Sequence, residues 1–507
     1  MRNFHKAYVR VLLAGVATVA LAAPAFAADT KEDARDVKLN ALEQKLDALI
    51  SEINQLKKEA AADKADKAAL ETQVIDLKRA QNAAYTDVQT QRNADVKVTL
   101  ANARPTFTTA DGAFALSLRS LLQYDTAYYS QDNRALSATD LSSGSNFRRA
   151  RIGFQGKAFS DWSYSFLYDF GGSGVEGAGL SDAYIQYDGI SWLKIRTGAF
   201  ATPGGIEDQT SASDLIFLER AAPTDLARSV GGSDGRKNFL SLISYNDNYY
   251  TALSWSGARA FDPVSFDSQQ ALVGRAAYRV YKDPNANILL SATGTYVFRL
   301  PQTAAGNNAG SPINLQVRPE NVVDGTRLIS TGNIDSKKFG LWGVEAAANW
   351  KNLYAQGGYF GFHANRRTGT LPNPNFDGWY AQATWVLTGE PRRYNAESAS
   401  WQTPRPAKPF SLKNGDLGAW ELAARVSELD LNFNEGIVGA STPAATGAIR
   451  GGKETGYTIG LNWYPNAVIR FLFDYQHEEI NRIGTAAPFR QIGQDVDILT
   501  ARAQLSF

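Results

Sequence analysis

Three arginines, Arg148, Arg149 and Arg151, crowd one short stretch of the chain, "FRRARIGFQGKAF" at residues 147–159. A guanidinium group carries its N–H donors in a planar fork that matches two oxygens of a phosphate or a carboxylate. We expect that local partners do not neutralise all three of these charges. The stretch therefore predicts a site that attracts oxyanions.

Side chains for catalysis or metal binding are scarce. The chain has no Cys and three His; His363 and His477 stand in no motif that supplies a catalytic partner, and His5 lies in the expected signal peptide. No metal-ligand spacing and no phosphate-binding glycine loop stands out. The 52 basic and 51 acidic residues exclude a globally basic protein. We therefore expect no enzyme, no cofactor, no metal site and no nucleic-acid partner.

The end of the chain indicates which elements hold the arginines. In "VDILTARAQLSF", Leu499, Ala501 and Leu505 share one parity, while Thr500 and Arg502 share the other. A period of two is the pattern of a strand with one apolar and one polar face. The apolar face packs on a second sheet in a soluble sandwich, but faces lipid in a membrane barrel whose polar face lines a water-filled interior. This strand alone leaves both readings open.

The same period recurs along most of the chain. We predict sixteen strands, at residues 114–124, 147–159, 162–170, 182–188, 192–200, 236–245, 249–257, 271–280, 287–298, 339–349, 353–363, 377–388, 417–427, 454–463, 467–477 and 496–507. Their connections alternate between short turns such as "GIS" and "YPN" and longer loops rich in Gly, Asn, Ser and Pro; residues 389–416 are the exception, long on the short-turn side. Such asymmetry is typical of outer-membrane barrels, whose short turns face the periplasm. The predicted fold is all-β, a 16-stranded antiparallel transmembrane β-barrel.

The N-terminal region follows other patterns. Residues 1–28 fit a secretory signal peptide, with a basic start, an apolar run and the cleavage pattern "APAFAAD"; an uncleaved anchor helix is the alternative. Residues 29–80 repeat apolar side chains at alternating spacings of three and four from Leu39, which predicts a self-associating α-helical coiled coil in the periplasm rather than a lone surface helix. Residues 81–112 are then a linker, and residues 113–507 form the barrel.

Basic side chains outnumber acidic ones on the expected inner face of the barrel. The eleven cations are Arg119, Arg149, Arg151, Lys157, Lys194, Arg196, Arg275, Arg279, Arg425, Arg470 and Arg502. The six acids are Asp169, Asp182, Asp188, Glu345, Glu421 and Asp474. Rings of Arg and Lys in a pore attract anions. The alternative is that these arginines pair with acids across the lumen and only keep the wall hydrated and rigid.

The connection at residues 201–235 is long and contains the apolar run "LIFL". A loop of this length calls for a function, and we expect it to fold into the barrel and narrow the pore. Asp208, Arg220 and Arg228 then lie near the constriction. An extracellular cap is the alternative.

Four stretches resemble the phosphate-selective porins of the O and P type. They are "FRRARIGFQGKAFSDWSYSFLYDF", "GWYAQATWVLTGEPRRY", "LGAWELAARV" and "TGYTIGLNWYPNAVIRFLFDY". The resemblance covers roughly residues 112 to 507 and leaves the coiled coil outside. It implies a homotrimer of sixteen-stranded barrels that pass anions, with an arginine ladder leading to a phosphate-binding constriction.

The resemblance also assigns residues. Arg148 and Arg149 match the paired arginines of the family, and Asp182 resembles the acid at its central binding site. Arg151 stands where phosphate-binding members have a tyrosine, and Ala201 and Asp208 stand where a second tyrosine and a lysine reach the constriction. These departures argue against tight phosphate selectivity and leave an anion-preferring wall.

We therefore expect a trimeric porin of the bacterial outer membrane for passive diffusion of small anions, phosphate among them. Its partners are these anions, outer-membrane lipid and two further copies of the chain, with a periplasmic or cell-wall partner left open for the coiled coil. Two other functions stay open: a general or sugar-type diffusion porin, and a structural protein that tethers the envelope.

Overall fold

The structure is a computed structural model. It describes residues 29–60, 67–93, 96–100, 104–132, 139–172, 179–231, 237–259, 267–302, 312–439, 447–484 and 488–507. The chain forms two compact units, one of Met1–Val96 with Thr109–Asp111 and one of Lys97–Thr108 with Gly112–Phe507. The expected signal peptide at residues 1–28 lies outside the described residues. None of the described helices is both long and apolar enough to span a bilayer.

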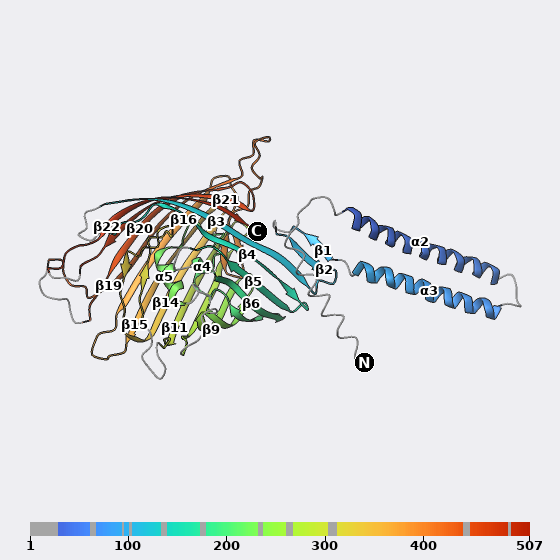
Figure 1. Cartoon of the computed structure of the whole chain (residues 1–507), viewed down its shortest axis with the longest axis horizontal. Coiled ribbons are helices and arrows are strands. Elements are labelled where there is room, and N and C mark those ends of the chain that lie inside the picture. The colour runs from blue at the N-terminus through green and yellow to red at the C-terminus, as the bar shows by residue number, and fades with distance from the viewer. Residues whose placement is uncertain are drawn as a thin grey trace. The chain divides into compact units, whose positions relative to one another are not determined.

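Two helices make up the N-terminal unit. Helix α2 (Asp29–Ala60) and helix α3 (Lys67–Asn93) pack against each other along their lengths (Figure 1). Ile53 on α2 is 5% exposed, because it lies in the apolar seam between the helices. The helical region thus extends beyond the expected boundary at residue 80, and its seam is shared within one chain. Self-association as a coiled coil stays a prediction.

The expected linker at residues 81–112 contains regular structure. It holds the end of α3 and two short strands, β1 (Val96–Thr99) and β2 (Thr106–Thr109). Strand β2 pairs with the first strand of the barrel, with Thr106 opposite Ser117. The β-branched residues of "VKVT" and "TFTT" favour this extended conformation.

The second unit is a closed antiparallel barrel. The main sheet has 18 strands. Two of them, β1 and β2, precede the barrel, and the other 16 are the number predicted from the sequence. The barrel strands are β3 (Ala115–Gln131), β4 (Gly144–Ala158), β5 (Trp162–Asp169), β6 (Gly179–Ile190), β7 (Leu193–Ala199), β8 (Lys237–Tyr245), β9 (Tyr249–Arg259), β10 (Gln270–Lys282), β11 (Ala286–Arg299), β14 (Ser336–Trp350), β15 (Leu353–Arg366), β16 (Asn375–Val386), β19 (Ala419–Phe433), β20 (Ile449–Tyr464), β21 (Ile469–Asn481) and β22 (Gln494–Ser506). Strand β22 pairs with β3 and closes the sheet. Within the described residues, each of the sixteen strands pairs with a neighbour on both sides.

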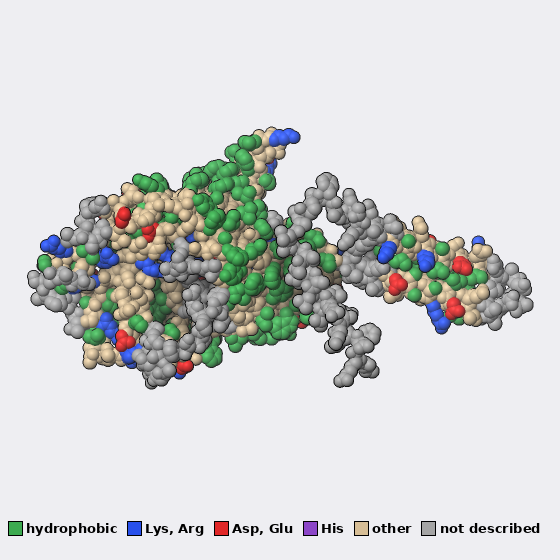
Figure 2. Space-filling model, viewed as in Figure 1, with side chains coloured by type: hydrophobic (Ala, Val, Ile, Leu, Met, Phe, Trp, Pro, Cys, Tyr) green, Lys and Arg blue, Asp and Glu red, His purple; other side chains and the backbone are tan. Residues whose placement is uncertain are grey.

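The alternation in the last strand separates outside from inside. Leu499 is 57% exposed on the outer wall, whereas its neighbours of the other parity, Thr500 and Arg502, are 8% and 2% exposed. Hydrophobic side chains form a band across the visible face of the barrel unit (Figure 2). The apolar parity therefore faces outward, towards lipid, and the polar parity faces the lumen.

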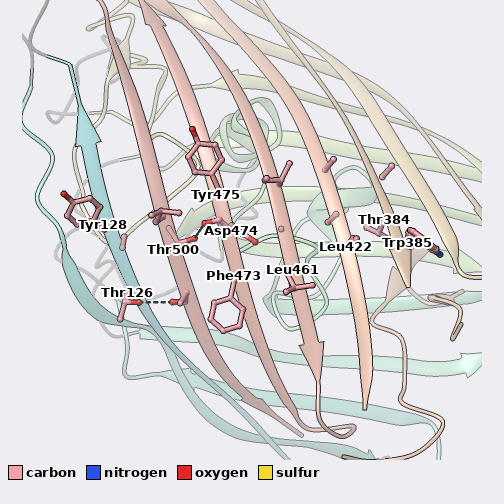
Figure 3. A pocket seen from close by; sticks show the side chains of 18 of the residues that line it. Thr126, Tyr128, Thr384, Trp385, Leu422, Leu461, Phe473, Asp474, Tyr475 and Thr500 are labelled. Atoms are coloured by element: carbon pink, nitrogen blue, oxygen red, sulfur yellow. Dashed lines mark hydrogen bonds between the residues drawn. The ribbon is translucent and has the colours of Figure 1, made fainter. Parts of the chain in front are cut away.

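The outer wall is concave across the last strands of the barrel, from β16 through β22 to β3. The small residues Ala383, Ala424 and Ala501 leave a hollow of about 1010 Å³ between larger side chains such as Leu422 and Phe473 (Figure 3). The apolar side chains around it belong to the outward parity. The hollow is thus a feature of the lipid-facing surface and is separate from the lumen.

Three connections have parts that fold into the lumen. The β7–β8 connection carries α4 (Ile206–Gln209) and α5 (Ala222–Gly231), which lie within the barrel outline (Figure 1). The β11–β14 connection carries β12 (Gln316–Val317) and β13 (Ile329–Ser330), and the β16–β19 connection carries β17 (Arg393–Asn395) and β18 (Ser400–Gln402). Of the two expectations for residues 201–235, insertion into the barrel is therefore the one observed for the described part.

Part of the inner wall is apolar, contrary to the expected polar interior. Phe360 and Phe362 on β15 face inward and are 1% exposed. They belong to one buried cluster with Leu226 of α5 and with Leu328 and Ile329 of the β11–β14 connection. The inserted segments supply the apolar partners, so these inward positions form a core at the end of the barrel opposite Phe507.

Because the apolar side chains of each strand face lipid, a charge placed among them should destabilise the barrel. L499R places a guanidinium against lipid near the middle of β22, and we expect it to lower the free energy of unfolding by about 2–4 kcal/mol. Urea titration of the protein refolded in lipid vesicles measures this change. The control I437R alters a side chain that is 77% exposed in the β19–β20 connection and leaves stability unchanged. Equal stabilities of the two variants would contradict the assignment of the outer face.

Candidate ion pathway

A β-bulge turns both paired arginines inward. Arg149 lies opposite Gln123 and Phe147 lies opposite Tyr124, so Arg148 is an extra residue on β4. A bulge of this kind locally breaks the strict alternation of a strand. Arg148 and Arg149 are accordingly 8% and 3% exposed, both inside the barrel.

Glu219 in the inserted β7–β8 connection pairs with both arginines. Its carboxylate lies 2.8 Å from Nε of Arg148 and 3.5 Å from Nη2 of Arg149. It also accepts a 3.0 Å bond from Nη2 of Arg502 on β22, and Arg502 makes two bonds of 2.6 Å to Asp125. Arg148 and Arg149 thus have an acidic partner, but they and Arg502 share only the two carboxylates of Glu219 and Asp125. The expectation that local partners do not neutralise every charge of the arginine cluster stays a prediction.

Arg151 is neutralised separately. Its Nε donates to Oδ2 of Asp169 on β5 at 2.6 Å. The side chains of Arg151 and Asp169 are 17% and 16% exposed, more than those of Arg148 and Arg149, at 9% and 4%. All three arginines of the "FRRAR" stretch therefore have an acidic partner, supplied by an adjacent strand or by the inserted segment.

The arginines keep Glu219 ionised. Burial raises the pKa of its carboxyl group, but the positive charges of Arg148, Arg149 and Arg502 lower it by more than burial raises it. The pKa therefore lies well below its usual value. A buried carboxylate with three cationic partners is a strong electrostatic link between two elements. It ties the inserted segment to β4 and β22.

Further wall arginines bind the main chain of the inserted segment. Arg470 donates to the carbonyl oxygens of Leu215 and Ile216 at 2.6 and 3.0 Å. Arg502 donates to Leu218 O at 2.6 Å, and Arg425 donates to Glu219 O at 2.9 Å. The stretch "LIFLE" has no sheet partner, and its buried carbonyl groups need other donors. These cations therefore hold the segment and do not line open lumen.

Arg275 and Arg220 also donate to main-chain carbonyl groups. They were expected on the surface of the pore, but both are buried. Arg275 on β10 donates to the carbonyl oxygens of Ser398 and Ala399 at 2.6 and 2.7 Å, and so binds the β17–β18 connection. Arg220 donates to Thr210 O at 2.6 Å within its own segment. The two residues are 3% and 5% exposed. Both are structural donors under the inserts.

A short glycine sequence fits the inserted segment against the wall. Glu345 on β14 accepts bonds from the N–H groups of Ile206 and Glu207, and so caps α4. A Cβ at Gly205 would lie 1.8 Å from Glu345 Oε2, so a larger residue there would displace the carboxylate that caps α4. Within the segment Arg228 Nε pairs with Asp208 Oδ1 at 2.6 Å. The two expected constriction residues Asp208 and Arg228 thus bind each other.

The remaining basic residues of the inner face are partly exposed. Side-chain exposures are 26% for Arg119, 17% for Arg151 and 19% for Lys194, against 1% for Arg425 and Arg502. Other partly or fully exposed cations of the expected set are Lys157, Arg196 and Arg279. Most of these residues lie on β3–β7, whereas inward side chains on β14–β22 are largely covered. The open part of the lumen therefore runs along β3–β7.

Positive charge dominates this open wall. The partly or fully exposed cations on the inner face of β3–β7 are Arg119, Arg151, Lys157, Lys194 and Arg196, and the partly exposed acids there are Asp169, Asp182 and Asp188; the buried Arg148, Arg149 and Asp125 are not counted. Arg119 lies 3.1 Å from Asp182, and Lys194 lies 3.6 Å from Asp188. The guanidinium of Arg196 stacks over the ring of Tyr184 at 4.3 Å. Five cations against three acids leave an excess of two positive charges.

Several residues that organise the lumen were not among the expected site residues. Glu219 is the central one, and its only sequence signal is a charged residue directly after the apolar run "LIFL". Arg392, in "LTGEPRRY", makes two bonds of 2.7 and 2.9 Å to the buried Glu421. Asp125 had no distinguishing pattern. Each depends on contacts between segments that are distant along the chain.

A closed sixteen-stranded barrel, with inserted segments narrowing a basic lumen, has the architecture of a porin. Residues 114–507 match the family model for phosphate-selective porin O and P, and the chain belongs to this family. Porin O of Pseudomonas aeruginosa is 24% identical over 389 residues, which cover 74% of this chain and 85% of that protein. An uncharacterized protein of Caulobacter vibrioides is 27% identical over 417 residues, covering 80% and 76%.

Among solved structures, OmpT of Vibrio cholerae in its trimer form aligns with a TM-score of 0.46 and 8% identity, over 78% of this chain and 100% of that chain. The family and the barrel together define the chain as an outer-membrane porin, a channel and not an enzyme.

Removal of the charge on Glu219 should loosen the inserted segment. E219Q removes the carboxylate that Arg148 and Arg149 share, and removing one partner of a buried ion pair costs about 3–5 kcal/mol. We expect faster proteolytic cleavage within residues 201–231 and noisier single-channel currents. The control E428Q removes a partly exposed partner of Lys453 and should change neither readout. Unchanged cleavage in E219Q would contradict the anchoring role.

The docking of α4 should depend on pH through Glu207. Burial raises the pKa of its carboxyl group to about 7, because it outweighs the favourable charge of Arg425. Between the usual pKa near 4.5 and about 7, a released segment ionises and the docked one does not, so docking weakens as pH rises. We expect more frequent current fluctuations at about pH 8 than at about pH 5. E207Q should abolish this difference; its persistence would exclude Glu207 as the cause.

Proposed function

We propose that the protein is a passive diffusion porin with a preference for small anions, which follow the open wall of β3–β7. The observation that carries this proposal is the excess of partly exposed cations on these strands, with five basic and three acidic side chains. The wall backs onto apolar, low-dielectric surroundings, which focus the field of the excess charge into the lumen. Anions are therefore attracted and cations repelled.

The inserted segments set the width of this path in the proposed mechanism. The β7–β8 and β16–β19 connections cover the opposite wall, so permeating ions pass between these inserts and β3–β7. The cationic side chains that face the path are held by acids or aromatic rings, as Arg119 is by Asp182 and Arg196 by Tyr184. Such positioned cations attract ions without a mobile gate.

Phosphate is one of the anions that we propose as solutes. The family description supports it, and arginine forks suit its oxygens. Two arrangements favour weak selectivity over tight binding: Arg148 and Arg149 are occupied by Glu219, and Asp208 is paired with Arg228. We therefore propose chloride and phosphate as competing solutes of one path. Tight phosphate capture is not part of the proposal.

We also propose the assembly and the location of the N-terminal unit. Three barrels associate as a homotrimer, which membership of the family supports. The last strand and the entry into β3 lie at one end, where Phe507 N donates to Ser120 O at 3.1 Å. If short turns mark the periplasmic end, helices α2 and α3 lie in the periplasm, where they are available to a cell-wall or periplasmic partner.

The function is tested by the reversal potential in a planar bilayer under a KCl gradient. Wild-type protein should pass chloride in preference to potassium, and added phosphate should reduce the chloride current. K194Q/R196Q removes two cations of the open wall, and we expect the anion-to-cation permeability ratio to fall at least about twofold. The control R299Q alters a pair with Asp267 whose side chains are 51% and 57% exposed, and the ratio should stay at the wild-type value.

Two results would contradict the proposal. Wild-type protein without anion preference would leave a general diffusion porin whose wall charges are balanced. A wild-type ratio in K194Q/R196Q would show that the open wall of β3–β7 does not select ions.

A further inference from the structure

A short hairpin projects from the barrel wall just before β19. Residues 404–418, here called the finger, connect the inserted β17–β18 pair to β19. The main chain of Ser411 and Asp416 pairs through two bonds of 3.0 and 3.1 Å. Gly415 between them has a φ of 73°, which suits a tight turn. Figure 1 shows a projection at the upper right of the barrel unit in the colour of this part of the chain. The finger is therefore a defined element and extends away from the lumen.

The base of the finger is fixed to aromatic residues on the outer wall. The ring of Phe410 packs edge-on against Trp463 at 5.2 Å, and Trp463 stacks on Trp420 at 5.5 Å. The indole N–H groups of both tryptophans donate to the carbonyl oxygen of Leu417, at 3.2 and 2.9 Å. Aromatic side chains of this kind lie at the boundary between bilayer and water.

The finger leaves the wall at the short-turn end of the barrel. Phe410 N donates to the carbonyl oxygen of Pro465 in the β20–β21 turn at 2.6 Å. The same turn receives the end of the chain, because Ser506 N donates to Val468 O at 2.8 Å. In the outer membrane this end faces the periplasm.

The exposed side chains of the finger combine two chemistries. Leu412 at its tip is 88% exposed, the highest value for a large apolar side chain among the described residues, and Leu417 is 64% exposed. Lys413 is exposed beside Leu412, and Lys408 is 78% exposed with its Nζ 3.6 Å from Asp416. Apolar side chains flanked by lysines suit an interface of acyl chains and phosphate groups. In Figure 2 the hydrophobic band continues onto the projection, which carries basic side chains at its tip.

We propose that the finger binds phospholipid of the periplasmic leaflet, with Leu412 and Leu417 among the acyl chains and Lys408 and Lys413 at the lipid phosphates. The apolar surface of the finger is continuous with the lipid-facing wall through Phe410 and Trp463, which favours lipid as the occupant. Its basic tip matches anionic headgroups better than it matches the apolar outer wall of a second copy. This anchoring role goes beyond conduction, and it rests on the outer-membrane location alone.

The absence of cysteine from the chain permits a site-specific test. L412C carries an environment-sensitive fluorophore in the full-length protein, reconstituted in vesicles of phosphatidylethanolamine and phosphatidylglycerol. We expect lipid brominated in the upper acyl chain to quench this label at least half as strongly as a label at L499C on the outer wall. A label at I437C, in a connection at the other end of the barrel, should be quenched by aqueous iodide instead.

The lysines are tested in the same labelled protein. Replacing phosphatidylglycerol by phosphatidylcholine should shift the emission of the label at L412C towards that of the label at I437C. The double variant K408Q/K413Q should remove this dependence on anionic lipid. K351Q, at an exposed lysine of the β14–β15 turn, is the matched control and should keep it. All variants should retain the wild-type reversal potential, so failure of this test is distinct from failure of the proposed function.

Two outcomes would overturn the proposal. A label at position 412 that iodide quenches and brominated lipid does not would place the finger in water. A label shielded from both quenchers would mean that protein, such as a neighbouring copy, covers it.

Discussion

The structure depends on one constraint: every backbone N–H and C=O group out of reach of water needs a hydrogen-bond partner. In the wall this requirement is met when β22 pairs with β3 and closes the sheet. Inside the barrel the β7–β8 connection has no strand to pair with. Arg470 and Arg502 donate to its carbonyl groups instead, so the same constraint explains both the barrel and the basic side chains beneath the insert.

Two kinds of arginine with different tasks follow from this arrangement. Those on the covered wall, such as Arg425 and Arg502, are desolvated and bound to the inserted segment and its acids. Those on the open wall, such as Arg119 and Arg196, keep contact with the lumen. Counting charges along the inner parity of the strands therefore overstates the charge that a permeating ion meets. The inserted segments select which cations act electrostatically on the path.

The contacts that anchor the inserted segments also set the width of the ion path. Glu219 joins the segment to β4 and β22, and Glu345 caps α4 from β14, so both carboxylates hold the segment against opposite parts of the wall. A change in either affects the width of the path without touching a residue on its surface. The outer face is organised independently, because its apolar band and the finger at its periplasmic edge respond to lipid.

The sequence alone determined the sixteen strands, their alternating faces and the closure implied by short turns and long loops, because a period of two and turn composition are local properties. It also indicated that residues 201–235 form an unusual connection. Only the tertiary structure decided which inward residues meet water. The bulge at Arg148 breaks the alternation, and the contact of Glu219 with Arg148, Arg149 and Arg502 joins residues far apart along the chain. Such pairings depend on how the insert packs, which no local pattern records.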